Sequence, residues 1–163
     1  MRAFFDHPEP RRVSPGEYPM WDRALALLNR DLAVTRPEQK PLQLMAFPPH
    51  DADEPENVYV ALADGQWHGN HLNPQAADAP ASALAIVADA AQETVTECLW
   101  QAWPLCAEHS LGMHPRDTDG QLSWWCAGER LHRGPGHIRA AVGALDTLVR
   151  DGGRVNATPF DGH

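Results

Sequence analysis

The sequence predicts an α+β fold, in which a small antiparallel sheet is packed by a long central helix and followed by a hairpin and a C-terminal helix. Two stretches, residues 21–36 and 82–99, place apolar side chains at helical spacing. In two shorter stretches, 42–47 and 58–62, one set of apolar side chains falls at every second position, which is the spacing of one face of a strand. Between residues 100 and 126, cysteines, histidines and tryptophans gather around turn-forming residues, which indicates a hairpin with chemistry of its own.

The chain is acidic, with 22 Asp and Glu against 13 Lys and Arg among 163 residues and a formal charge of -9. Its basic residues are scattered, so we expect no nucleic-acid partner, because phosphate backbones are repelled. No apolar run reaches the roughly 20 residues of a spanning helix, and the N-terminus lacks a signal-peptide pattern. We therefore expect a cytoplasmic protein with no membrane partner. Three cysteines in such a chain favour free thiols or metal ligands over disulfides.

Residues 1–20 are expected to form an extended arm, because four prolines between positions 8 and 19 forbid a continuous helix. An α+β body over residues 21–103 follows. Its first helix opens near Asp22 and is ended by Pro37, and its second begins with Ser82 as N-cap. Together with the later segments these parts are expected to make one folded unit.

The body's sheet is predicted from two runs of alternating residues. The strand at 42–47 ends at a proline pair, and the acidic stretch 50–57 reads as a solvated loop. The next strand, 58–62, is expected to turn at Asp64-Gly65 into a returning partner strand, since both turn positions tolerate positive φ. The return carries two histidines three positions apart, which a strand directs to opposite faces, so no metal site is expected there.

Zinc-ligand residue types are concentrated after the second helix. Cys106 and His109 form a Cys-x2-His arrangement that can sit on one turn and bind a single ion. Asp119-Gly120 is a favoured hairpin turn, and the strand that follows it ends at Cys126. We expect this hairpin to return Cys126 to the side of the Cys-x2-His turn.

A fourth ligand is needed for tetrahedral zinc, and the spacing leaves two candidates. His114 lies before the hairpin and must fold back within a short loop, whereas His132 lies after Cys126 and gives a ribbon-type pattern. Cys98 lies on the apolar stripe of the second helix, where a thiol behaves as a small hydrophobe, so it is left out of the site. Residues 104–137 are thus predicted to be a zinc-binding, zinc-ribbon-like hairpin.

The chain is predicted to close with a helix and tail over residues 138–163. Ile138, Val142 and Leu145 fall on one helical face, and a glycine pair ends the pattern. The tail beyond it is short and polar, so we expect it to contribute little to the core.

Several short motifs between Val87 and Leu145 bear on the fourth ligand. They are Trp103-Pro104, Cys106 to His109, His114-Pro115, Trp125-Cys126 and Val142-Gly143-Ala144-Leu145, after a helix rich in alanine and acidic residues. In these motifs the stretch resembles a group of small uncharacterised actinobacterial proteins, although Ala107 stands where that group usually has proline. The resemblance implies that Cys106, His109, His114 and Cys126 belong together, which favours His114, and it implies no activity.

The expected function is that of a small acidic protein-interaction module with a structural zinc site, such as an adaptor, a regulator or an immunity-type partner of another protein. Four protein ligands leave no position for water, so the metal holds the fold. The alternative is a zinc-dependent hydrolase or deaminase-like enzyme, in which Cys106, His109 and Cys126 leave an open position and Glu108 or Glu129 is the general base. The Pro-Cys-x2-Cys half of zinc deaminases is absent, which favours the interaction module.

Overall fold

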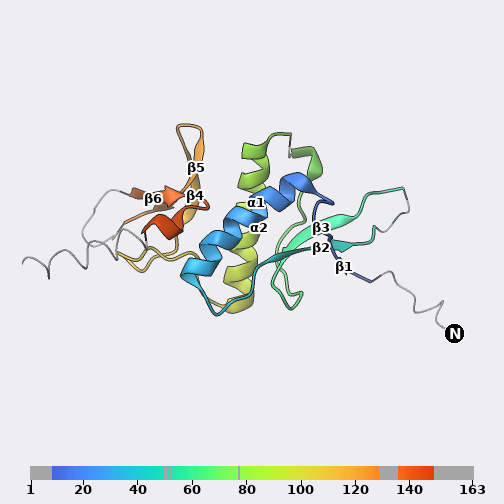
Figure 1. The fold of residues 1–163 in the computed structure, drawn as a ribbon, viewed down its shortest axis with the longest axis horizontal. Helices are drawn as coiled ribbons and strands as arrows, with labels where there is room; N and C mark the ends of the chain where they lie inside the picture. The colour runs from blue at the N-terminus through green and yellow to red at the C-terminus, as the bar shows by residue number, and fades with distance from the viewer. Residues whose placement is uncertain (1–8, 50, 52, 77, 129–135, 149–163) are drawn as a thin grey trace, which may run out of the picture. The chain divides into compact units, whose positions relative to one another are not determined.

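A computed structural model shows two compact units (Figure 1). The N-terminal unit comprises residues 1–25 and 41–101, and the C-terminal unit comprises residues 26–40 and 102–163. The structure describes residues 9–49, 51, 53–76, 78–128 and 136–148. Two antiparallel three-stranded sheets and the helices beside them confirm the predicted α+β class.

The sheet of the N-terminal unit has the strand order β1-β2-β3. β1 (Arg11–Arg12) pairs with β2 (Gln43–Phe47), and β2 pairs with β3 (Asn57–Ala61), both antiparallel. Alternation puts Leu44 and Val60, which lie opposite each other, in the core. The predicted strand at 42–47 is confirmed, and the acidic stretch after it connects β2 to β3.

The predicted return strand after Asp64-Gly65 does not form. The turn is present, with Gly65 at φ 94°, but Trp67 makes only an isolated bridge to Ala61. β2 pairs with one edge of β3, and the segment after the turn makes isolated contacts with this region, including a hydrogen bond from the Leu72 amide to the Val58 carbonyl at 2.7 Å. Trp67 instead stacks on Tyr59, with ring centroids 3.9 Å apart.

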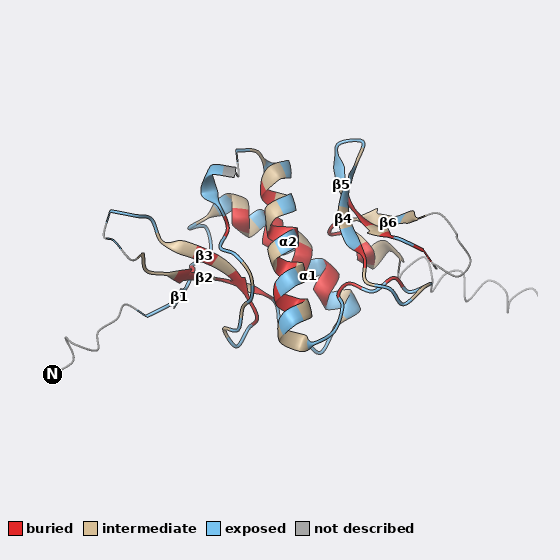
Figure 2. Ribbon diagram, turned by 180° about the vertical axis from the view of Figure 1, so that it is seen from behind, coloured by how far each residue is buried: buried red, intermediate tan, exposed pale blue. Residues whose placement is uncertain are grey.

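α2 (Pro80–Leu99) is the long helix of this unit, and it packs on β3. Its buried stripe, red in Figure 2, consists of Ala83, Val87, Ala88, Ala91, Thr94 and Val95. The Thr94 hydroxyl lies 3.0 Å from the carbonyl of Val60 and donates to it. The helix begins two residues before the predicted cap Ser82, with Ala79 as N-cap and Pro80 in the first turn, because proline suits a position whose N–H has no helical partner.

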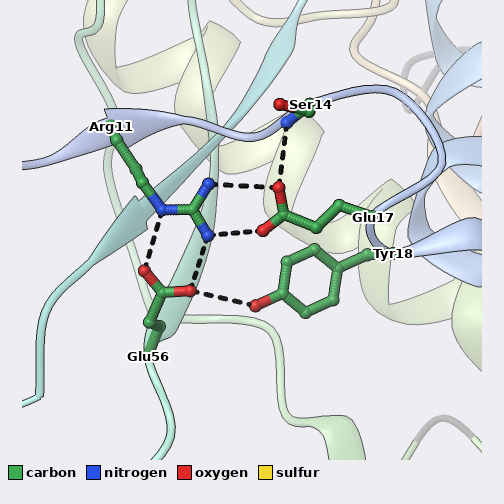
Figure 3. Close-up of polar contacts among 5 residues, drawn as sticks. All are labelled: Arg11, Ser14, Glu17, Tyr18 and Glu56. Atoms are coloured by element: carbon green, nitrogen blue, oxygen red, sulfur yellow. Dashed lines mark hydrogen bonds and ion pairs between the residues drawn. The ribbon is translucent and has the colours of Figure 1, made fainter.

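An ion cluster on β1 ties the described part of the arm to the body (Figure 3). The Arg11 guanidinium donates to the carboxylates of Glu17 and Glu56, and the Tyr18 hydroxyl also lies 3.3 Å from Glu56. These hydrogen bonds from Arg11 lower the pKa of both glutamates. Arg11 and Arg12 are thus held at the sheet edge, whereas residues 15–18 turn and α1 already begins at Pro19, inside the predicted arm. Residues 1–8 lie outside the described residues.

The sheet of the C-terminal unit has the order β4-β5-β6. β4 (His114–Thr118), β5 (Gln121–Cys126) and β6 (His137–Ala141) are antiparallel. Asp119 at φ 53° and Gly120 at φ 82° form the turn between β4 and β5. The predicted hairpin is confirmed, because this pair accepts the left-handed backbone that a tight hairpin requires.

The predicted helix from Ile138 is wrong over its first residues, which form β6. Pairing with β5 overrides the helix propensity of the Arg-Ala-Ala run, and Gly143 at φ 95° then ends the strand in a turn. Helical residues begin only at Leu145, and positions 149–163 lie outside the described residues.

α1 (Pro19–Thr35) runs from the N-terminal unit into the C-terminal one, and its second half supplies a buried carboxylate to the latter. Asp31 accepts hydrogen bonds from the Trp124 indole at 2.7 Å, the Gly143 amide at 2.6 Å and the Leu145 amide at 3.0 Å. Burial raises the pKa of Asp31 above its usual range. These bonds fix β5 and the turn after β6 against the helix. Among the described residues no helix is long and apolar enough to cross a bilayer.

Candidate metal centre

The first two side chains of the site come from a tight turn before β4. The Cys106 amide donates to Leu111 at 2.8 Å, and the Ser110 amide donates back to Cys106 at 2.7 Å. Ser110 has φ 57°, which lets the chain reverse directly after His109. The turn brings Cys106 Sγ within 3.6 Å of His109 Nδ1.

The other two side chains face each other across β5 and β6. Cys126 pairs directly with His137, so both side chains project from the same face of the sheet. Trp124, two residues before Cys126, lies on that face as well and is fully buried. At Gly136 an added Cβ would lie 2.2 Å from the Trp125 ring, so glycine permits the close approach that positions His137.

Four ligand-type atoms thus converge, all within 4.8 Å of one another. His109 Nδ1 lies 3.5 Å from Cys126 Sγ and 3.3 Å from His137 Nε2. Cys106 Sγ lies 3.8 Å from His137 Nε2. Both thiols are buried and both rings are half-buried, so the cluster is sheltered from bulk water.

The two thiols differ in acidity. Burial raises the pKa of Cys106, but hydrogen bonds from His109 and from the backbone outweigh it and leave the pKa below its usual value. At Cys126 burial prevails and raises the pKa. A bound cation lowers the pKa of both, since thiolate is the form that ligates.

Three of the predicted ligands, Cys106, His109 and Cys126, are brought together. The fourth member of the group is His137, the last residue of the predicted zinc-binding segment 104–137, which was not among the predicted ligands. The missed signal is the Cys126 to His137 separation, which fits two adjacent strands once residues 137–141 are read as a strand.

Of the two predicted candidates for the fourth ligand, His114 and His132, the structure describes only His114. His114 opens β4 opposite Trp125, is exposed and is not in the group, so the prediction that favoured it differs from the structure. The physical reason is that β4 and β6 flank β5 on opposite sides, and only β6 pairs with Cys126. His132 lies outside the described residues. Cys98, half-buried on α2, is likewise not part of the group.

Of the two candidates for the general base of the enzyme alternative, Glu108 and Glu129, the structure describes only Glu108. Glu108 lies in the tight turn, with its side chain 63% exposed and its carboxylate 3.2 Å from the Arg139 guanidinium. Glu129 lies outside the described residues.

No family model, curated protein or solved structure matches this chain.

Proposed function

We propose that this chain binds one zinc ion through Cys106, His109, Cys126 and His137, and that the metal has a structural role. The observation that carries the proposal is the mutual spacing of the four ligand atoms. Two sulfur and two nitrogen atoms meet at one point from a turn and from two adjacent strands.

The spacing matches a tetrahedron around zinc. Zinc binds sulfur at about 2.3 Å and nitrogen at about 2.0–2.1 Å, so tetrahedral angles give sulfur–nitrogen separations of about 3.6 Å and a nitrogen–nitrogen separation of about 3.3 Å. Three of the four sulfur–nitrogen distances are 3.6, 3.8 and 3.5 Å, and the nitrogen–nitrogen distance is 3.3 Å. These four distances are close to those of a tetrahedral zinc site.

The ligand types favour zinc over other common ions. Calcium and magnesium take oxygen ligands, and iron–sulfur clusters are usually held by four cysteines. Two thiolates and two imidazoles in a tetrahedron are typical of structural zinc. The shelter of both thiols supports the same choice, because it keeps them from solvent and oxidants.

A structural role follows from the number of ligands. Catalytic zinc keeps one position for water, whereas here a fourth protein side chain, His137, fills that position. Glu108, the candidate base of the enzyme alternative, is paired with Arg139. Both observations favour a structural metal that links the turn of Cys106 and His109 to the strands of Cys126 and His137.

The zinc proposal is tested by elemental analysis of purified protein after dialysis. We expect one zinc per chain in the wild type and loss of zinc in Cys106→Ala. Cys98→Ala is the matched control, because it also removes a thiol but from α2, and it should keep its zinc. Metal-free wild type, or equal zinc loss in both variants, would overturn the proposal.

The metal-stapled region is further proposed to serve as a protein-interaction module. Leu105, Leu111 and Ile138 are 39%, 39% and 41% exposed, and each lies within two positions of a proposed ligand. Exposed leucine and isoleucine side chains held on a rigid turn and strand suit an apolar patch on another protein.

The interaction role is tested with a protein captured from the host lysate, then purified and titrated calorimetrically. A combined Leu105→Ser and Ile138→Ser variant that retains zinc should lose binding, because the apolar contacts are gone while the fold remains. Equal binding by this variant and the wild type would contradict the proposed surface.

A further inference from the structure

Each of the two imidazole rings can present either nitrogen to a metal, so a neighbouring group is needed to fix which nitrogen it presents. His137 directs Nε2 to the cluster, so as a neutral ligand it carries its proton on Nδ1. A ligating histidine is usually held by an acceptor on this second nitrogen. The acceptor must come from a residue outside the four ligands.

Glu108 is placed to be that acceptor. Its Oε2 lies 4.0 Å from His137 Nδ1, the nitrogen that faces away from the metal. The side chain is 63% exposed, so the carboxylate has room to approach this nitrogen more closely. Glu108 sits between Cys106 and His109 in the chain, while His137 is on β6.

Arg139 holds the carboxylate on this side of the site. Its NH1 donates to the same Oε2 at 3.2 Å. The pairing register of β5 and β6 shifts at Arg139, which has no partner on β5, and both Arg139 and His137 lie within 4.0 Å of Oε2 of Glu108. The carboxylate is therefore anchored by one residue of β6 and directed at another.

We propose that Glu108 is a positioning residue for the metal, which accepts the Nδ1 proton of His137 and so fixes the ring and raises its basicity. This inference rests on the zinc proposal. It assigns to Glu108 a role different from the general base of an enzyme, because the carboxylate acts on a ligand and never on a bound water. It also explains why a charged side chain stands in the middle of the Cys-x2-His turn.

The test measures zinc affinity by competition with a chromophoric chelator. Glu108→Gln should weaken zinc binding by about 10–100-fold, as loss of such an outer carboxylate generally does. Glu38→Gln is the matched control, since Glu38 is 62% exposed and also lies beside an arginine, Arg36, in the C-terminal unit. Its zinc affinity should equal that of the wild type.

A second pair of variants, made on a chain that carries His137→Cys, distinguishes positioning of the His137 ring by Glu108 from simple attraction between its charge and the zinc ion. In His137→Cys the fourth ligand is a thiolate with no N–H, so adding Glu108→Gln there should leave zinc affinity unchanged. An equal loss in both backgrounds means that Glu108 acts only through its charge, which overturns the inference. So does an unchanged affinity in the single variant.

Nitrogen NMR of the zinc-loaded wild type provides a readout that does not depend on the cysteine background folding. The Nδ1 proton of His137 should be protected from exchange and lose that protection in Glu108→Gln, while the other ligand ring is unaffected. Equal exchange in both proteins would overturn the inference. Wild type that binds no zinc would instead defeat the zinc proposal, so the two failures are distinguishable.

Discussion

Replacing Asp31 by alanine is expected to destabilise the C-terminal unit more than any surface substitution. The carboxylate is fully buried and accepts three hydrogen bonds, from the Trp124 indole and the amides of Gly143 and Leu145. All three donors are obligate, because neither an indole N–H nor an amide N–H can accept instead. Alanine would leave them buried without this acceptor.

The magnitude follows from these donors and from the charge that is removed. Each stranded donor costs about 1–3 kcal/mol, so three give about 3–9 kcal/mol. Removing Asp31 also relieves the desolvation of a buried carboxylate, which is several kcal/mol and offsets part of that loss. We expect a net loss of about 3–5 kcal/mol, a large share of the roughly 5–15 kcal/mol that stabilises a domain. Asp31→Asn keeps one acceptor oxygen and should lie between alanine and the wild type.

The assay is urea unfolding followed by tryptophan fluorescence and far-ultraviolet circular dichroism, with linear extrapolation to water. Asp89→Ala, an exposed aspartate on α2, is the control and should stay within about 0.5 kcal/mol of the wild type. If Asp31→Ala also stays within about 1 kcal/mol of the wild type, the three hydrogen bonds do not stabilise the unit to the expected extent.

Three further predictions follow from the same structure. Gly143→Ala should lower the free energy of unfolding by about 2–4 kcal/mol, because Gly143 has positive φ and an added Cβ would lie only 2.6 Å from Leu27. Gly120→Ala should lower it by only about 1 kcal/mol, because Gly120 has φ 82° but open space around it. Thermal melts of the two variants compare these losses. Arg11→Ala should lower the melting temperature slightly at neutral pH and leave it unchanged at acidic pH, because the lowered pKa of the two glutamates means that their stabilisation is present above the usual carboxyl range and lost as pH falls. Chelation should lower the melting temperature, since zinc at about 100 times its Kd stabilises by about 2.7 kcal/mol, and added zinc should restore it.

The parts of the fold that were predictable are those with a strong local signal. The Asp119-Gly120 turn sits between two alternating stretches, so the β4–β5 hairpin follows from the sequence, and with it the return of Cys126. The Cys106 and His109 pair needs only one turn of chain, and the structure has it there. These features are encoded within a few residues.

What was missed depends on contacts distant in the chain. His137 stands before a run that favours helix locally, and only pairing with β5 makes it a strand that faces Cys126. The buried position of Asp31 has a faint signal, since it falls three positions after Leu28 on the apolar stripe of α1. Its partners lie more than 90 positions away, so no local pattern identifies them.

The central claim, a zinc ion completed by His137, is tested most directly by the zinc content of two histidine variants. His137→Ala should lose tightly bound zinc, because it removes one of four ligands. His114→Ala, an exposed histidine on β4, should retain one zinc per chain. Retention by His137→Ala together with loss from His114→Ala would contradict the proposed coordination.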